Sequence, residues 1–457
     1  MNTYRDLSTR LNDPSLLVDK AFVSGKWVAA DNAHTFEVTN PSTGQVICTV
    51  PDMGVSETKR AIDAAYVAQK NWAAQTGKER SAILRRWYDL MINNADDLAA
   101  ILTAEMGKPF VEAKAEVMYG ASFIEWFSEE AKRVYGDVIP GHQQDKRILV
   151  LKQPIGVVAS ITPWNFPNAM IARKAGPALA VGCAFVSKPA KQTPLSALAM
   201  AVLAERSGLP SGLLSVVTSS SSATIGKEFC DNDQVRKLTF TGSTEVGRIL
   251  MRQSADQIMK TSMELGGNAP FIVFDDADLD AAVEGAMISK YRNNGQTCVC
   301  ANRLYVQSDV YDAFAEKLVA EVKNMKVGDG FTDGVTTGPL IDQTALDKVK
   351  EHITDATEKG AKVITGGNSH GLGGTFFEPT VLTGVKKNMA VAVEETFGPV
   401  APLFKFETVD DVIEQANDTI FGLASYFYAR DLSRVWKVAE ALEYGMVGIN
   451  TGIVRGI

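Results

Sequence analysis

From residue 155 onward the sequence repeats one pattern, a short apolar run followed by an amphipathic segment, and this constrains the fold more than any other feature. Strands are predicted at IGVVASITP (155–163), CAFVSKP (183–189), LLSVVT (213–218) and VRKLTFTG (235–242), each followed by a helix. Four strand–helix units in a row predict a doubly wound parallel sheet. Ligands of such sheets bind at the carboxyl ends of the strands.

A second alternating stretch begins at PFIVFDD (270–276). It predicts helices at 278–292, 309–323, 408–417 and 432–443, and strands at RLYVQ, near 363, 377 and 400, at ASYFYA and at VGIN. We therefore predict an α/β protein with two doubly wound parallel-sheet lobes that meet near residue 263. Upstream, apolar residues at helical spacing fill 56–134, and alternation around a PGHQQDK turn predicts a two-stranded ribbon within 136–154.

The charge balance and composition exclude several partners. The 457 residues include 46 Lys+Arg and 54 Asp+Glu, a formal net charge of −8, which disfavours a general nucleic-acid-binding surface. No run reaches the ~18 apolar residues of a membrane-spanning helix, and the polar N-terminal segment has no signal-peptide core. The five cysteines are too scattered for a disulfide framework. We expect a cytoplasmic protein without a nucleic-acid or membrane partner.

The segment TFTGSTEVGR places Gly242 and Gly247 at a predicted strand-to-helix turn, where Ser243 can cap the helix. Backbone N–H groups at such a helix start favour an anion such as pyrophosphate. Arg248 and Ile249 stand where a nucleoside-triphosphate P-loop has Lys and Ser or Thr, and no G-x-G-x-x-G occurs in the chain. About half of such glycine turns are only tight connections, so this motif alone does not assign a ligand.

Cys298 lies in NNGQTCVCANR, a loop after a predicted helix that could bring a thiol to a cleft. A catalytic thiol needs partial exposure, whereas the commoner fate of a lone cysteine is to be buried and inert. No metal site is predicted, because the four histidines show no ligand spacing with this cysteine: His34, His142, His352 and His370. A Cys-His protease would need one of them close in space, which the sequence leaves open.

Two further polar residues are candidates for chemistry. Glu264 in SMELGGNAP precedes a Gly-Gly turn, where a partly desolvated carboxylate could act as a general base, although a solvated side chain is favoured by about two to one. Asn165 in ITPWNFP follows the first parallel strand, and its amide could point at a developing oxyanion. The alternative for Asn165 is a turn residue before Pro167.

The motifs PWNFP, KPA, FTGSTEVG, MELGGNAP, GQTCVCANR and EETFGP occur together in this order. In order and spacing they resemble the aldehyde dehydrogenase superfamily, over about residues 20–452. Within that family the segments SFIEWF, YRNNGQTCVCANR and LEYGMVGINTG are most similar to the bacterial, NADP-type succinate-semialdehyde dehydrogenases.

The resemblance implies a mechanism. Cys298 would be the nucleophile that forms a thiohemiacetal, and Asn165 and the Cys298 N–H would form the oxyanion hole. Hydride would pass to a nicotinamide, leaving a thioester that Glu264 resolves by activating water. The alternatives are a catalytically silent family member and an ester or thioester hydrolase that uses the same cysteine without a cofactor.

The resemblance also implies where the cofactor binds. Glu395 and Phe397 would hold the nicotinamide riboside and Lys188 the adenosine ribose, while the groove would be lined by Trp164, Asn165, Gly242, Ser243 and Leu265. Lys191 stands where NAD-preferring relatives often carry Glu. Because a lysine attracts a 2′-phosphate that a glutamate would repel, we expect NADP to be preferred, with NAD possible.

The expected substrate is a small semialdehyde with a distal carboxylate. Arg173 in MIARK and Arg292 in YRNNGQTC would hold that carboxylate, as they do in similar dehydrogenases. A single arginine is more often a surface ion-pair partner. Succinate semialdehyde is predicted, and glutarate semialdehyde stays open because one methylene discriminates by only ~1–3 kcal/mol.

The resemblance assigns a role to each part of the chain. Residues 1–135 and 155–262 would form a dinucleotide-binding domain, 136–154 an oligomerisation arm, 263–447 a catalytic domain and 448–457 a truncated C-terminal segment. The family's C-terminal strand is expected to be missing, as is a substrate-binding serine close to Arg455. We therefore expect a homo-oligomer, a dimer or tetramer, that is weakened by this loss.

Cys300, two residues beyond the nucleophile, suggests a redox hypothesis. A reversible Cys298–Cys300 disulfide could form under oxidation, because accessible low-pKa thiols beside a second cysteine are common sensors. A neutral neighbour is about as frequent, so the sequence leaves the two open.

Overall fold

The computed structural model describes residues 3–454. The chain divides into two units: unit 1 comprises Met1–Asn40, Gln45–Met106 and Ala113–Glu264, and unit 2 comprises Pro41–Gly44, Gly107–Glu112 and Leu265–Ile457. Each unit has a seven-stranded sheet of its own, which confirms the predicted α/β class with two parallel-sheet lobes. Residues 455–457 of the segment predicted at 448–457, Arg455 among them, lie outside the described residues.

The sheet of unit 1 has the strand order β11-β10-β7-β8-β9-β1-β2. β7 and β8 are buried along their whole length, because parallel strands are covered by helices on both faces. The sequence predicted β7 to β10 but not β11. The five parallel strands are β7 (Val157–Ile161), β8 (Ala184–Lys188), β9 (Leu214–Val216), β10 (Val235–Thr241) and β11 (Lys260–Glu264), and the antiparallel edge is β1 (Ala21–Val23) and β2 (Lys26–Val28).

The helices of unit 1 pack in two groups. α6 (Ala169–Ala180) and α7 (Pro194–Arg206) pack against α3 (Gly77–Asn93), while α8 (Ser222–Asp231) packs against α2 (Val55–Ala74) and α9 (Thr244–Ala255). The helical stretch predicted at 56–134 consists of α2, α3, α4 (Ala95–Met106) and α5 (Phe110–Glu130). α3 begins with a capping box in which the Thr76 hydroxyl accepts from Glu79 N and the Glu79 carboxylate accepts from Thr76 N. The remaining elements are α1 (Thr3–Ser8), a 3₁₀ turn (Pro14–Leu16), and the pair β3 (Thr35–Thr39) and β4 (Val46–Pro51).

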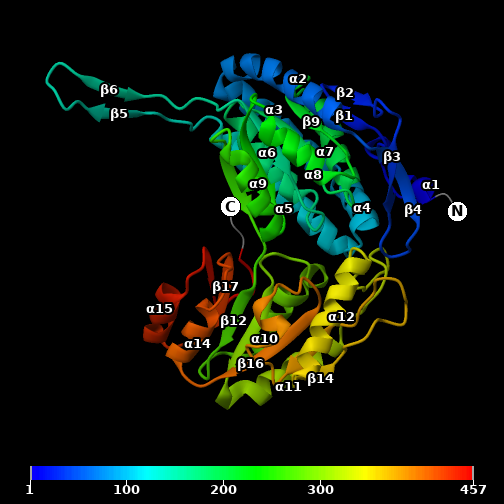
Figure 1. Cartoon of the computed structure of the whole chain (residues 1–457), viewed down its shortest axis with the longest axis vertical. Coiled ribbons are helices and arrows are strands. Elements are labelled where there is room, and N and C mark those ends of the chain that lie inside the picture. Colours follow the sequence, from blue (N-terminus) through cyan, green and yellow to red (C-terminus); the bar gives the residue numbers. More distant parts are fainter. Residues whose placement is uncertain (1–2, 455–457) are drawn as a thin grey trace. The chain divides into compact units, whose positions relative to one another are not determined.

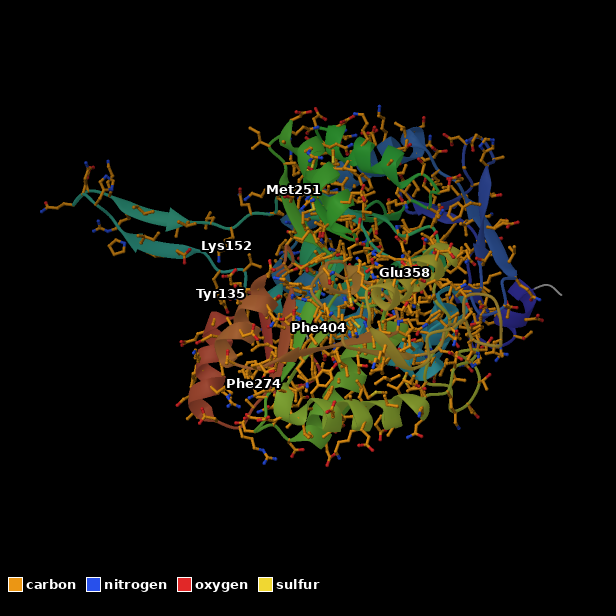
Figure 2. The ribbon with its side chains drawn as sticks, turned by 60° about the horizontal axis from the view of Figure 1, so that its bottom comes forward. Tyr135, Lys152, Met251, Phe274, Glu358 and Phe404 are labelled. Carbon is orange, nitrogen blue, oxygen red and sulfur yellow. The ribbon has the colours of Figure 1, made fainter. Side chains whose placement is uncertain are left out.

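The predicted ribbon is present as a separate two-stranded sheet. β5 (Asp137–Pro140) pairs antiparallel with β6 (Arg147–Val150), with Val138 opposite Leu149. Figure 1 shows the ribbon extending away from the helices of unit 1, and Figure 2 labels Tyr135 and Lys152, which flank it in the sequence. Val138 is 80% exposed and Leu149 66%. An apolar surface of this kind is typical of an interface, and the ribbon's role as an oligomerisation arm stays a prediction.

The sheet of unit 2 has the strand order β14-β15-β16-β13-β12-β17-β18. All neighbours are parallel except β14 and β15. The strands are β12 (Ala269–Val273), β13 (Ala301–Gln307), β14 (Lys362–Thr365), β15 (Thr380–Thr383), β16 (Val400–Phe406), β17 (Ala424–Tyr428) and β18 (Met446–Ile449). The helices are α10 (Leu279–Tyr291), α11 (Tyr311–Lys323), α12 (Gln343–Glu358), α13 (Ala390–Val393), α14 (Val409–Asn417) and α15 (Leu432–Ala441), with 3₁₀ turns η2 (Arg292–Gly295) and η3 (Ser308–Val310).

The apolar run PFIVF serves both faces of this sheet. Phe271 and Val273 belong to a buried cluster with residues of α10 and α11. Ile272 and Phe274 belong to another with residues of α12, α14 and α15, which also contains Phe404; Figure 2 labels Phe274 and Phe404. Because side chains alternate along a strand, a continuous apolar run is what a strand covered on both faces requires.

The structure corrects the predicted elements of unit 2 at two places. α12, a 16-residue helix, was not predicted. Its start is capped by Asp342, which accepts from Ala345 N. The strand expected near 377 is β15, which begins at Thr380, and Phe377 forms only an isolated bridge with Ser369.

Candidate active site

The candidate residues of unit 1 follow the carboxyl ends of its parallel strands. Lys188 is the last residue of β8 and pairs in register with Ile161 of β7, the strand that leads to Trp164 and Asn165. Glu264 ends β11 opposite Thr241 of β10, which leads to Gly242 and Ser243. The structure therefore brings these six residues to the one sheet edge at which such folds bind ligands.

The Gly242 turn leaves the start of α9 open. Gly242 N donates to Glu264 O at 3.1 Å, and the Ser243 hydroxyl accepts from Val246 N at 3.3 Å. A side chain at Gly242 would meet the Phe240 ring at 2.5 Å. Ser243 is exposed, so the amino end of this 12-residue helix is accessible to an anion.

Two lysines place positive charge beside β8. Lys188 is 1% exposed and its Nζ donates to Ser222 Oγ at 2.6 Å. Burial lowers the pKa of Lys188 to about 8, and the charge of Lys191 lowers it further in the same direction. Lys191 itself is exposed. Two cations this close, with one held rigidly, favour a phosphorylated ligand.

The environment of Glu264 agrees with the solvated alternative that the sequence favoured. Its side chain is exposed, so the partial desolvation that was considered for a general base is absent. Lys174 of α6 was not predicted as a candidate. It is buried, and its Nζ donates to Thr239 Oγ1 at 2.9 Å. Burial lowers the pKa of Lys174 to about 8, and the charge of Glu264 acts against this shift. A lysine next to Arg173 in the otherwise apolar segment MIARKAGPALA was the available signal.

The other side chains of unit 1 bear on substrate binding and the oxyanion. Asn165 is buried, and a donor that is shielded from water stabilises an oxyanion more strongly than an exposed one. Arg173 of α6 is half-buried, and its guanidinium lies over the Phe123 ring, 5.3 Å from the centroid. The Phe123 ring holds the face of the Arg173 guanidinium by a cation–π contact. The N–H groups at the edges of the guanidinium can donate to a carboxylate.

In unit 2 the candidates lie at the amino ends of the strands. Cys298 precedes β13, Leu265 and the Gly-Gly pair precede β12, and Glu395 and Phe397 precede β16. Gly267 N donates to Glu395 Oε1 at 2.9 Å. Burial raises the pKa of Glu395 to about 7, while this hydrogen bond and two nearby lysines oppose the shift. The carboxyl-end rule thus applies to the candidates of unit 1 only.

A chain of unusual backbone conformations leads into the Cys298 loop. Asn293, Asn294 and Gly295 follow one another with φ values of 53°, 56° and 74°. Asn and Gly tolerate this left-handed region better than other residues. A side chain at Gly295 would also meet Gly398 O at 2.1 Å. The motif RNNGQTC is therefore explained by backbone shape as much as by chemistry.

Three contacts then hold the Cys298 loop. Gln296 Oε1 accepts from Ile341 N at 2.9 Å, and Tyr426 Oη donates to Val299 O at 2.7 Å. Gly267 packs so closely that an added Cβ would lie 2.2 Å from Cys298 O. The Cys298 side chain is partly exposed, so the loop presents a thiol on a fixed backbone.

Cys300 is buried, whereas Cys298 is partly exposed. Cys300 is 1% exposed, and its Sγ donates to the carbonyls of Ser289 and Lys290, each at 3.0 Å. Burial raises the pKa of the Cys300 thiol. These contacts oppose the disulfide hypothesis, because the thiol would have to leave α10 and lose its proton to react.

Arg292 begins η2, six residues before Cys298, and is half-buried. Among residues 3–454, His, Cys, Asp and Glu side chains form no group of three that could hold a metal ion. One of the four histidines, His352, is buried and lies 3.1 Å from Thr396 Oγ1 through its Nδ1. Over the same residues, no helix is long and apolar enough to cross a membrane.

Comparison with known proteins agrees with the motifs. Residues 27–457 match the aldehyde dehydrogenase family. Glutarate-semialdehyde dehydrogenase of Pseudomonas aeruginosa is 65% identical over 97% of this chain and 92% of its own length. The NADP(+) succinate-semialdehyde dehydrogenase of Escherichia coli is 63% identical over the same shares. The crystal structure of succinate-semialdehyde dehydrogenase from Burkholderia pseudomallei has a TM-score of 0.97 at 63% identity, covering 98% of this chain and 92% of that one. The resemblance drawn from the motifs is confirmed: the chain belongs to the aldehyde dehydrogenase family and is an oxidoreductase.

Proposed function

We propose that this protein oxidises a short dicarboxylic semialdehyde, succinate semialdehyde first, to the dicarboxylate, with NADP as the hydride acceptor. The observation that carries the proposal is the partly exposed Cys298 thiol on a backbone fixed by Gly267 and Tyr426. Family membership and the names of the two similar dehydrogenases support the reaction and the substrate class.

Cys298, Asn165 and Glu264 carry the chemistry. The Cys298 thiolate attacks the aldehyde carbon, and the oxyanion of the resulting thiohemiacetal receives hydrogen bonds from the Asn165 amide and the Cys298 N–H. NADP, when bound, accepts the hydride. Hydride loss leaves a thioester, and the exposed Glu264 carboxylate takes a proton from the water that hydrolyses it. Aldehyde, water and NADP thus yield carboxylate, NADPH and two protons.

Residues of both units fit a phosphorylated dinucleotide. In unit 1 the open start of α9 suits the pyrophosphate, and Lys188 and Lys191 suit the adenosine ribose with its 2′-phosphate. Trp164 and Leu265 would line the groove. In unit 2, Glu395 would accept hydrogen bonds from the nicotinamide ribose, and it accepts most strongly when it is ionised, because both oxygens are then charged acceptors. We therefore assign dinucleotide binding to unit 1 and the nucleophile to unit 2.

Arg173 and Arg292 would hold the distal carboxylate of the substrate by paired charged hydrogen bonds. A second candidate substrate is glutarate semialdehyde, favoured by the 65% identity to a glutarate-semialdehyde dehydrogenase. A pocket discriminates one methylene by only ~1–3 kcal/mol, so both acids can be substrates of one site.

Comparison of kcat/KM for succinate semialdehyde, glutarate semialdehyde and butanal tests the substrate class. Butanal matches succinate semialdehyde in length and lacks the carboxylate. We expect both acids to exceed butanal by at least ~100-fold, and Arg292→Met to remove most of that difference. Equal kcat/KM for butanal and the acids would contradict the assignment of the two arginines. Hydrolysis of an ester or thioester without NADP, in place of aldehyde oxidation, would support the hydrolase alternative instead.

The assembly and the compartment also remain proposals. We propose that the ribbon of β5 and β6 joins copies of the chain into a dimer or tetramer. Its apolar side chains are exposed, and contact with another copy of the chain would bury them. We further propose a cytoplasmic enzyme, in keeping with cysteines that form no disulfide framework.

A further inference from the structure

Unit 2 buries a lysine that the proposed chemistry does not use. Lys290, near the end of α10, has no exposed surface. Its Nζ donates to Asn302 Oδ1 at 2.8 Å, and in the described part of the chain it forms no ion pair. An ammonium that is buried against a neutral amide is costly, so a role for this charge must be sought in what lies around it.

A chain of hydrogen bonds leads from Lys290 to the nucleophile's backbone. Asn302, in β13, donates through Nδ2 to Gly267 O at 3.4 Å. The N–H of Gly267 donates to Glu395 Oε1 at 2.9 Å. Gly267 is also the residue at which an added Cβ would lie 2.2 Å from Cys298 O. Gly267, whose C=O accepts from Asn302 and whose N–H donates to Glu395, therefore packs directly on Cys298.

The charge of Lys290 also acts on Glu395. Burial raises the pKa of Glu395 to about 7, and the charges of Lys348 on α12 and Lys290 on α10 lower it. Burial lowers the pKa of Lys290 itself, while Cys300 and Glu395 act against that shift. The neighbouring Glu394 is exposed and lies 3.4 Å from His352 Nε2, away from this pair. The two lysines are thus the cations that favour an ionised Glu395.

We propose that Lys290 and Asn302 are positioning residues, which hold the Gly267 peptide against Cys298 and supply a buried positive charge to Glu395. The geometric half of this proposal stands on contacts within unit 2 alone. The consequence for catalysis rests on the proposed function, in which an ionised Glu395 binds the cofactor ribose.

The first test measures hydrogen–deuterium exchange at Gly267. The double variant Lys290→Met/Asn302→Leu replaces both polar partners by apolar side chains of similar size, so neither side chain is left without the other, and the Gly267 carbonyl loses the Asn302 donor. We expect the Gly267 amide to exchange at least about threefold faster. The matched control is Lys317→Met on α11, which removes an exposed lysine that pairs with Asp280, and its exchange should equal that of wild type. Unchanged exchange in the double variant overturns the positioning role, whether or not the protein oxidises any aldehyde.

The second test measures the KM for NADP against pH. Without the cation Glu395 holds its proton to a higher pH, so the acid limb of the profile should move up by about half a pH unit or more in the double variant. Lys290→Gln keeps a donor for Asn302 but removes the charge, so we expect a shifted limb with nearly normal exchange at Gly267. A merely structural defect lowers kcat at every pH and leaves the limb in place, and that result overturns the electrostatic half.

The two readouts separate this proposal from the proposed function. If wild type forms no NADPH from any semialdehyde while the double variant still exchanges faster at Gly267, the proposed function fails and the positioning role stands. If wild type turns over and every variant has the wild-type exchange rate at Gly267 and the wild-type pH dependence of the KM for NADP, the positioning role fails and the proposed function stands.

Discussion

At the scale of single residues, the electrostatic surroundings decide which charged side chains can do chemistry. Lys188 is buried and hydrogen-bonded to Ser222, and Lys191 is exposed beside it. A buried cation that is fixed in place gives position, and an exposed one adds charge at little desolvation cost. This division of labour suits a ribose that carries a phosphate.

Replacement of Lys191 by glutamate tests the cofactor assignment. In Lys191→Glu the reversed charge repels a 2′-phosphate, so we expect kcat/KM for NADP to fall by at least about tenfold and the preference to move toward NAD. Initial rates with each cofactor measure the change. Lys227→Glu, an equal reversal at an exposed lysine that pairs with Asp231, should leave the ratio of the two rates as in wild type. The cofactor assignment is wrong if Lys191→Glu leaves it unchanged too.

The sequence predicted where some candidate residues lie better than what surrounds them. Asn165 and Lys188 follow or end the predicted strands β7 and β8 at one sheet edge of unit 1, because strand ends can be read from apolar runs. Glu264 lies at the same edge, but it ends β11, a strand that was not predicted. The exposure of Glu264 could not be read in this way, since it depends on which side chains from distant segments cover the end of β11. Lys174 was missed for the same reason.

At the scale of elements, the loop before β13 is the most strongly constrained segment of the candidate site. Two asparagines and a glycine in left-handed conformations lead into it, and Gly267 abuts it. Such strained backbone persists only where surrounding contacts over-determine it. Here those contacts come from Gln296 and Tyr426.

Addition of a single methyl group should disturb this loop. Gly267→Ala places a Cβ 2.2 Å from Cys298 O, so the loop must shift; a displacement of about 1 Å can cost 10²-fold, and we expect kcat to fall by roughly that factor. Steady-state kinetics measure it. Gly371→Ala, where an added Cβ meets nothing within 4 Å, serves as the control. A Gly267→Ala variant with normal kcat would show that the close packing does not position the thiol.

Two features of unit 2 were left out of the sequence-based prediction. α12 carries buried Leu346, Val349 and Ile353 at helical spacing, so its periodicity was present and was not used. The rule for carboxyl ends describes ligands of a doubly wound sheet, whereas Cys298 and Glu395 precede β13 and β16. In unit 2 the loops that enter the strands carry the candidates.

At the scale of the whole molecule, the alternation of strands and helices was sufficient to predict two sheets, since each parallel strand needs a crossover helix. Short strands were predicted at AFVSGKWV and near 363 and 377, but their antiparallel pairing at the sheet edges, β1 with β2 and β14 with β15, was not predicted. These strands are short, and their pairing depends on long-range contacts rather than on local pattern. The ribbon was predicted because its turn and alternation are local.

The ribbon's role can be tested by placing charge on it. Val138 and Leu149 face each other across β5 and β6 and are both exposed, so Val138→Asp/Leu149→Asp should leave the fold of unit 1 intact. We expect the oligomer to dissociate into smaller species, because burying two carboxylates at an interface is unfavourable. Light scattering after size-exclusion chromatography measures the mass. Val67→Asp, at an exposed valine of α2, should not change it, and an unchanged mass in the double variant would contradict the arm assignment.

The central claim is that Cys298 oxidises a semialdehyde with NADP. NADPH formation from succinate semialdehyde by wild type, Cys298→Ala and Cys48→Ala tests it most directly, because Cys48 is also partly exposed and its loss removes a thiol outside the candidate site. We predict turnover by wild type and Cys48→Ala, and a fall of at least ~10³-fold in Cys298→Ala. A folded wild-type protein without turnover, or a Cys298→Ala variant that keeps its rate, would contradict the account.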